Sequence, residues 1–300
     1  MKPCPFPEYS QDFPTASQLQ SAAQPVILRG VVAHWPGVSK ALQGPQALLE
    51  WLAAQDAGQS VEAILLRPEE NGRVFYNAQM DGFNFFRKPL TVSAALEQLA
   101  RYSHFANPPS MAIQSAPLAD CLPGVLASHR MPLLDEAVAP RIWIGNRILT
   151  PAHFDESCNI ACVMAGRRRF TLLPPEQVGN LYIGPLDFAP TPTPISLADL
   201  RRPDLLRMPR LQQALEAAHT VELAPGDALY IPPLWWHQVE SLADLNVLVN
   251  YWWPAHQQQE GQHAAISCLL HCLRHMGHLS AAEKQGWQAL FGHYLFNPAP

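Results

Sequence analysis

Short apolar segments alternate with turn residues over most of the chain, and this pattern predicts β-strands rather than long helices. From about residue 110, apolar runs of four to six residues follow one another, separated by proline, glycine and polar residues. Such short and closely spaced runs are typical of a sandwich or barrel. The expected strands are Met111–Gln114, Arg141–Ile144, Asn159–Met164, Arg168–Leu173, Ala228–Ile231 and Val247–Trp252.

The first part of the chain mixes strand and helix patterns. Residues 1–24 show no regular period, and we expect a loosely structured N-terminal arm there. Residues 25–32 and 61–66 are rich in β-branched and other apolar side chains and are predicted as strands. Pro45 stands where the first turn of a helix would begin, and residues 91–102 predict a second helix.

The C-terminal residues 255–300 change to helical spacing. One apolar stripe is followed by a second, and Ser280 with Glu283 between them forms a capping-box pattern. The two stripes consist of Ile266, Leu269, Leu270, Leu273 and Met276, and of Trp287, Leu290, Phe291 and Tyr294. These helices either pack on the barrel or pair with a second copy of the chain as a homodimer, and the sequence leaves both open.

The predicted organisation is therefore an arm at 1–24, a barrel domain at 25–254 and a helical segment at 255–300. The densest strand and site motifs lie at 141–254. A proline-rich insertion at 176–220 interrupts them and is expected to act as a lid or substrate-facing loop.

Composition narrows the class of protein. The 300 residues are 48% hydrophobic and 15% charged, which is enough to bury a core and excludes a disordered chain. The net charge is −5 and no basic run occurs, so nucleic acid is not the expected partner. No apolar run reaches the roughly 20 residues of a membrane span, and the N-terminus lacks a signal core. With six cysteines and no dense framework, we expect free thiols and a cytoplasmic protein.

The candidate chemistry centres on residues 150–159, TPAHFDESCN. The period of two in a strand predicts that His153 and Asp155 face the same side. His237, which follows two prolines and two tryptophans, is the third candidate ligand. Two histidines and one carboxylate form the facial triad of non-haem Fe(II) oxygenases, with coordination positions left open. Taken alone, a histidine such as His237 beside two tryptophans is more often a packed, hydrogen-bonded core residue.

Arg168 adds a second signal. Alternation along its strand places Arg168 with Phe170 and Leu172 on one face, while Arg167 and Arg169 face the other way. An arginine among apolar neighbours is costly unless it binds an anion. A small dianion could chelate the metal at one end and form an ion pair with Arg168 at the other, which would explain both features. The alternative is three solvated arginines on an exposed strand.

Five segments together carry a family resemblance. They are TPAHFDESCN, GRRRFTLLPPEQ, LYIGP, PGDALYIPPLWWHQVES and VNYWWP, in this order. The chain resembles the JmjC/cupin-like 2-oxoglutarate oxygenases over residues 141–254, and more weakly over 24–140. The pattern is most similar to the branch that contains the asparaginyl hydroxylase inhibiting hypoxia-inducible factor.

The resemblance implies a mainly β fold with helices, a double-stranded β-helix or jelly-roll, followed by the C-terminal helices. It implies Fe(II) bound by His153, Asp155 and His237, which would be the catalytic residues. It also implies 2-oxoglutarate as co-substrate and O2 as oxidant. The family's 2-oxoglutarate contacts map onto Thr150, Asn159, Arg168 and Asn250, and Gln114 is expected to line the pocket.

The chain departs from the family pattern at two positions. Close relatives use lysine where this chain has Arg168, whose longer, bidentate side chain implies a shifted co-substrate. The family often has a tyrosine where this chain has Ala112. The missing hydroxyl would then come from elsewhere, with Tyr76 and Tyr182 as candidates.

The function implied is hydroxylation of a C–H bond, with a protein or peptide side chain as the expected substrate and succinate and CO2 released. A transfer-RNA base, a small molecule and methyl-lysine remain alternatives within the family. Two other classes stay open: a non-catalytic cupin-fold binding protein, and a metal-dependent isomerase or dioxygenase that needs no 2-oxoglutarate. The combination of Arg168, Thr150 and Asn250 favours the co-substrate enzyme.

A second cysteine and histidine cluster stands in the C-terminal segment. Its members follow at helical spacing and are consistent with either a zinc site or packed thiols: Cys268, His271, Cys272 and His275.

Overall fold

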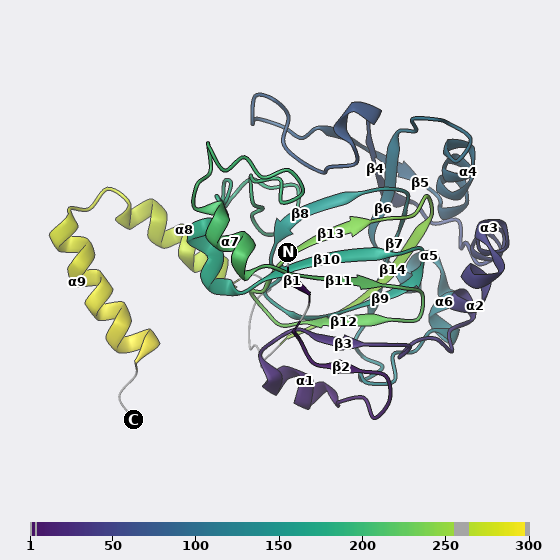
Figure 1. The fold of residues 1–300 in the computed structure, drawn as a ribbon, viewed down its shortest axis with the longest axis horizontal. Coiled ribbons are helices and arrows are strands. Elements are labelled where there is room, and N and C mark those ends of the chain that lie inside the picture. The colour runs from purple at the N-terminus through teal and green to yellow at the C-terminus, as the bar shows by residue number, and fades with distance from the viewer. Residues whose placement is uncertain (1, 4, 255–263, 298–300) are drawn as a thin grey trace. The chain divides into compact units, whose positions relative to one another are not determined.

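The computed structural model describes residues 2–3, 5–254 and 264–297 (Figure 1). It consists of two compact units, Met1–His256 and Gln257–Pro300. The strands are β1 Lys2–Pro3, β2 Glu8–Tyr9, β3 Val26–Leu28, β4 Val61–Leu66, β5 Phe85–Leu90, β6 Ser110–Pro117, β7 Pro140–Gly145, β8 Leu149–His153, β9 Cys158–Ala165, β10 Arg168–Leu173, β11 His219–Leu223, β12 Ala228–Ile231, β13 Trp236–Ser241 and β14 Asn246–Trp253. The helices are α1 Ala16–Ala22, α2 Pro36–Gln43, α3 Pro45–Ala53, α4 Val92–Tyr102, α5 Leu118–Cys121, α6 Pro123–Ser128, α7 Leu211–Ala217, α8 Ala264–Met276 and α9 Ala281–Phe291.

Within the described residues of the first unit, the strands form two facing sheets. The smaller has the order β1-β11-β10-β13-β8, and the larger has the order β2-β3-β12-β9-β14-β7-β6-β4-β5. Phe170 and Leu172 of β10 meet Ala161 and Val163 of β9 in an apolar cluster between the sheets. The predicted mainly β jelly-roll fold is therefore confirmed.

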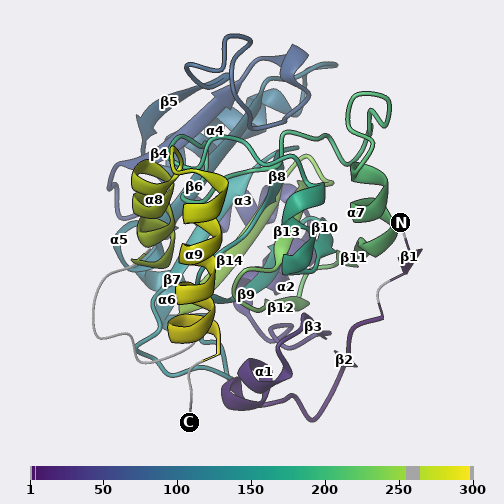
Figure 2. The same ribbon diagram turned by 90° about the vertical axis from the view of Figure 1, so that its left-hand side faces the viewer.

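Alternation along the strands gives the larger sheet two apolar faces. In β9, Ala161 and Val163 face the smaller sheet, whereas Ile160, Cys162 and Met164 face outward. The outward side chains pack against helices α2 to α6, which lie together on one side of the sheets (Figure 1). On the other side, α7 packs on the outer face of the smaller sheet (Figure 2).

All six strands predicted between residues 111 and 252 form, several of them longer than expected. Beyond these six, the structure adds β13 and also β11, whose first two residues lie at the end of the segment 176–220 assigned to the insertion. The inserted loop therefore ends before His219, where the chain returns to the smaller sheet and pairs with β10. The alternation in β11 is short and includes polar residues, so its pattern alone does not identify a strand.

The N-terminal residues correct the expectation of a loose arm. Strand β2 pairs in parallel with β3, and α1 begins at a capping box formed by Thr15 and Gln18. Arg29 joins this segment to the barrel through ion pairs with Glu8 at 3.0 Å and Asp227 at 2.8 Å. Strands of two residues have no period to detect, and only the partner strand reveals them.

Strand β8 is the edge of the smaller sheet, but other backbone segments cover it. The Val74 N–H donates to the Leu149 carbonyl, and the Leu149 N–H donates to the Gly72 carbonyl. Further along, the Ser196 N–H donates to the Ala152 carbonyl. This pairing satisfies the edge and holds β8 in place.

The second unit contains the two predicted helices, α8 and α9. The expected capping box is present, because the Ser280 hydroxyl accepts from the Glu283 N–H and the Glu283 carboxylate accepts from the Ser280 N–H. Cys268, His271, Cys272 and His275 lie along α8, but among the described residues they form no group of three converging ligands. The suggested zinc site is therefore not assembled within the described part of one chain. No described helix is long and apolar enough to cross a membrane.

We expect the apolar side chains of this unit to pair with a second copy. Leu269, Leu273, Trp287 and Leu290 are between 44% and 50% exposed. Truncation after residue 258 should therefore convert a dimer into a monomer in sedimentation velocity. Leu290→Arg should weaken the dimer, whereas Gln285→Arg on the same helix should not. A full-length chain that sediments as a monomer would contradict the expectation.

Candidate metal centre

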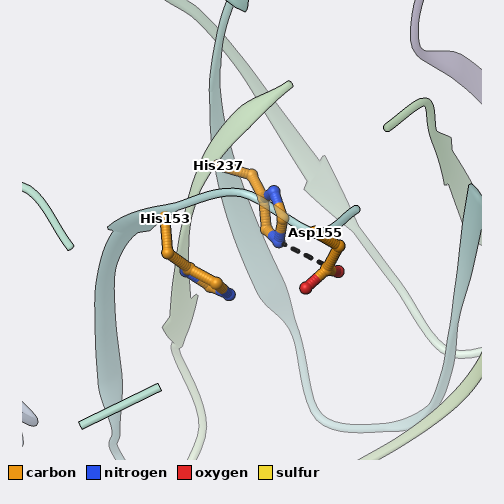
Figure 3. A group of neighbouring side chains, drawn as sticks. All are labelled: His153, Asp155 and His237. Atoms are coloured by element: carbon orange, nitrogen blue, oxygen red, sulfur yellow. Dashed lines mark ion pairs between the residues drawn. The ribbon is translucent and has the colours of Figure 1, made fainter. Parts of the chain in front are cut away.

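Three side chains predicted from sequence converge at one end of the barrel (Figure 3). The antiparallel pairing of β13 with β8 places His237 directly opposite His153. One ligand atom from each of His153, Asp155 and His237 lies within 4.8 Å of the other two. The predicted strand position of Asp155 needs correction, because β8 ends at His153 and Asp155 lies in the following loop.

Backbone carbonyls fix both imidazole rings. His153 Nδ1 lies 2.9 Å from the Pro151 carbonyl oxygen, and His237 Nδ1 lies 2.9 Å from the Trp235 carbonyl oxygen. Each ring therefore donates through Nδ1 and keeps the Nε2 lone pair for a metal. Burial, together with the neighbouring His237, lowers the pKa of His153 to about 4, so this ring is neutral at pH 7.

The Asp155 carboxylate is held by a network of donors on one oxygen. Oδ2 accepts from Trp252 Nε1 at 2.9 Å and from Asn159 Nδ2 at 3.0 Å. Asn250 Nδ2 in turn donates to Asn159 Oδ1 at 2.8 Å. Oδ2 also lies 3.7 Å from His237 Nε2. Because Oδ1 has no hydrogen-bond partner among the described residues, it is available to a metal.

Asn159 and Asn250 thus lie behind the carboxylate in this structure. Their assignment as 2-oxoglutarate contacts follows from the resemblance alone, and the hydrogen bonds here show a role in orienting Asp155. Trp252 completes the same network, a role not predicted from the sequence. The sequence pattern could have indicated this role, because alternation in β14 places Trp252 on the same face as Asn250.

Arg168 lies between the sheets, as alternation predicted. It is 7% exposed, and its neighbours on the same face, Phe170 and Leu172, are fully buried. Its Nε is buried without a hydrogen bond, and no carboxylate pairs with it among the described residues. Burial lowers the pKa of Arg168 to about 10, so the guanidinium remains charged at neutral pH. Arg169 on the opposite face bonds Glu222 at 2.7 Å.

A buried cation without a partner is unfavourable by itself. The orphaned guanidinium therefore fits the distal carboxylate of 2-oxoglutarate, which would satisfy its donors. The two imidazoles and one carboxylate fit Fe(II). The described residues thus suit both groups that the resemblance implies.

Thr150 and Gln114 belong to strands that border this interior. Thr150 pairs with Val239 across an irregularity in the β8–β13 ladder. This irregularity lets Thr150 and His153, three residues apart, both face inward. Gln114 is half-buried, and alternation places it opposite Ile113, on the face of Ala112.

The two tyrosines considered as replacements for the missing hydroxyl are engaged elsewhere. The Tyr76 hydroxyl donates to the Phe188 carbonyl at 2.7 Å, and the Tyr182 hydroxyl accepts from the Arg210 N–H at 3.1 Å. Trp143 of β7 is a better candidate, since it packs against the inner cluster and its indole N–H is buried without a hydrogen bond. The alternation of Arg141–Ile144 carried this signal, because it separates Trp143 from Ile142 and Ile144.

Comparison with known proteins gives matches over most of the chain. The sequence pattern of the family described as "Cupin-like domain" matches residues 12–259. Jumonji C domain-containing protein 5 of Drosophila melanogaster is 26% identical over 258 residues, 83% of this chain and 60% of that protein. Lysine-specific demethylase 8 of Xenopus tropicalis is 26% identical over 257 residues, 83% of this chain and 51% of that protein.

A shorter match is more similar. HSPB1-associated protein 1 of Rattus norvegicus is 38% identical over 113 residues, 37% of this chain and 23% of that protein. The chain therefore spans between 23% and 60% of the length of these three relatives.

We expect Trp252→Phe to weaken Fe(II) binding, because the change removes one donor from Asp155 and keeps the aromatic bulk. Loss of such a supporting hydrogen bond lowers metal affinity by roughly 10- to 100-fold. Metal affinity measured under nitrogen by competition with a chelator checks this.

Trp253→Phe is the matched control. Trp253 is the next residue in β14 and packs against the outer cluster beside Tyr230, 6.0 Å between ring centroids. Its replacement should leave Fe(II) affinity unchanged. Equal affinities in both variants and the natural chain would remove Trp252 from the metal centre.

Proposed function

The chain belongs to the cupin-like domain family, and from this premise we propose that it is an Fe(II)- and 2-oxoglutarate-dependent dioxygenase. It hydroxylates a C–H bond of a protein side chain. The observation that carries the proposal is Arg168, a charged and unpaired guanidinium buried on the same inner face as His237. A metal protein without a dianionic co-substrate has no use for this costly arrangement.

The metal would be held by His153, Asp155 and His237. Bound Fe(II) with 2-oxoglutarate supplies the oxidising chemistry, in which O2 yields succinate, CO2 and one oxygen atom inserted into a C–H bond. The protein contributes geometry. The Pro151 and Trp235 carbonyls orient the two imidazoles, and Trp252 with Asn159 orients Asp155.

Arg168 would fix the far end of the co-substrate. It pairs across the smaller sheet with Ser241 of β13, whereas His237 pairs with Leu172, four residues further along β10. Arg168 and the metal ligands therefore face the same space between the sheets, but at different positions along the strands. Trp143 offers a further donor from the facing sheet.

The names of two relatives and the charge of the chain both favour a protein substrate. One relative is named as a lysine-specific demethylase, and another is named for its association with the protein HSPB1. This chain has a net charge of −5 and no basic run, which disfavours a nucleic-acid substrate. The five described cysteines are free thiols, as expected of a protein acting in the reducing cytoplasm.

Anaerobic titration of the Fe(II)-loaded protein with 2-oxoglutarate tests the proposal without knowledge of the primary substrate. We expect a weak, saturable visible charge-transfer band from the chelate. Asp155→Ala should abolish Fe(II) binding and the band without unfolding the barrel, because it removes a ligand. Asp120→Ala, at an exposed site in α5, should change neither. Bound iron without a band would contradict the proposal.

Arg168→Ala should weaken 2-oxoglutarate binding far more than Fe(II) binding. A lost charge-assisted hydrogen bond corresponds to roughly a 10- to 100-fold rise in the dissociation constant. Arg168→Lys should recover much of the affinity, because it restores a cation. Arg169→Ala, which changes the neighbouring outward-facing arginine, should have no effect. Equal 2-oxoglutarate affinity in Arg168→Ala and the natural chain would show that the cation is misplaced.

A further inference from the structure

A cleft of about 820 Å³ opens away from the metal ligands. Leu149 lines it at the beginning of β8, whereas His153 ends that strand. Ser241 lines it at the end of β13, whereas His237 lies at the beginning. The cleft therefore lies at the opposite end of these two strands, and its volume is that of a small-molecule site.

Arg73 is held rigidly in the wall of this cleft. Its neighbours Gly72 and Val74 both hydrogen-bond to the backbone of Leu149. Gly72 has a φ of +72°, and a Cβ there would collide with the Arg147 carbonyl oxygen, so this close backbone approach requires glycine. These contacts fix the backbone on both sides of Arg73.

The Arg73 guanidinium has unused hydrogen-bonding capacity. It stacks 3.7 Å from the Phe75 ring centroid, and one Nη donates to the Leu197 carbonyl at 3.0 Å. Its Nε is buried and has no hydrogen-bond partner. Burial lowers the pKa of Arg73, which means that its positive charge is poorly solvated.

The carboxylates around the cleft already have partners. Asp199 accepts from Arg201, Asp244 accepts from Arg147, and Glu240 accepts from Gln238. Glu70 accepts from Asn84. Glu69 is exposed and borders the cleft.

Two guanidiniums of the cleft form no ion pair among the described residues, although Asp199, which Arg201 already holds, is close enough to Arg73 to help stabilise its charge. Arg73 bonds only a carbonyl, and the exposed Arg202 side chain has no ion pair among the described residues. Nearby, Phe105 is 55% exposed, with its ring 5.9 Å from that of Tyr102. The cleft thus combines two arginines that form no ion pair with an exposed aromatic surface.

We propose that this cleft is a second binding site, separate from the metal centre, for an organic oxyanion. The phosphate or carboxylate group of the ligand bonds the Arg73 guanidinium through its terminal nitrogens and the side chain of Arg202, and its apolar body lies on Phe105. The site takes no part in the oxidation, so its occupancy and the proposed enzymatic activity are independent questions.

The arginine Nε–Hε resonances of the full chain in NMR test this directly, with phenyl phosphate, benzoate and inorganic phosphate as probes. Arg73→Lys and Arg202→Lys assign the two signals. We expect the Arg73 signal to shift saturably with phenyl phosphate or benzoate, and whichever binds tighter identifies the anionic group. Inorganic phosphate should bind several-fold more weakly than phenyl phosphate, because it lacks the ring.

Matched variants keep the test specific. Arg202→Gln should weaken the binding several-fold, Phe105→Ala should remove the preference for phenyl phosphate over inorganic phosphate, and Arg207→Gln, outside the cleft, should change neither. A linear, non-saturating shift of Arg73, or a shift confined to Arg168, would overturn the proposal. Equal affinity for phenyl phosphate and inorganic phosphate would overturn the role of Phe105.

Discussion

The site depends above all on the antiparallel pairing of β13 with β8. This register sets His237 opposite His153, although the two residues lie far apart in the sequence. The irregularity between His237 and Val239 then turns Thr150 to the same interior. A shift of one residue would turn the side chains of β13 to the other face and separate the ligands. The backbone bonds from Gly72, Val74 and Ser196 to β8 stabilise this edge and therefore the metal centre.

The interior combines an apolar core with a few polar groups that lack protein partners. Most buried polar groups in a folded protein are hydrogen-bonded. The Nε of Arg168 and the Nε1 of Trp143 have no such partner, which indicates that a ligand binds between them. Asp155 shows the opposite arrangement, because three donors or near neighbours crowd one of its oxygens. The protein thus rigidly positions the metal carboxylate and leaves the co-substrate cation unsatisfied. The unsatisfied cation costs stability when no anion is bound, and both arrangements favour binding of the groups that they would hold.

Strands β8 and β13 contribute residues to a different site at each end of the barrel. His153 and His237 lie at one end of the β8–β13 pair, and Leu149 and Ser241 border the cleft at the other. Arg168 and Arg73 are both guanidiniums with a buried, unpaired Nε, but they belong to different environments. Arg168 is buried on the same strand face as Phe170 and Leu172, whereas Arg73 stacks on Phe75 in the wall of the open cleft. This difference suits a deeply enclosed co-substrate in the first case and an exchangeable ligand in the second.

The sequence alone determined those features that depend on local spacing. The period of two identified the barrel strands and placed Arg168 inward and Arg169 outward, and the residues around His153 and His237 indicated the triad. Tertiary structure decided what depends on distant partners. Strands β1 and β2 exist only because β11 and β3 pair with them, and Asp155 joins the triad from a loop rather than from the strand. Trp252 acts on Asp155, and Arg73 enters a cleft, through contacts between segments that no local pattern relates. Local periodicity records which face a side chain occupies, whereas only the register between strands determines which residues it meets.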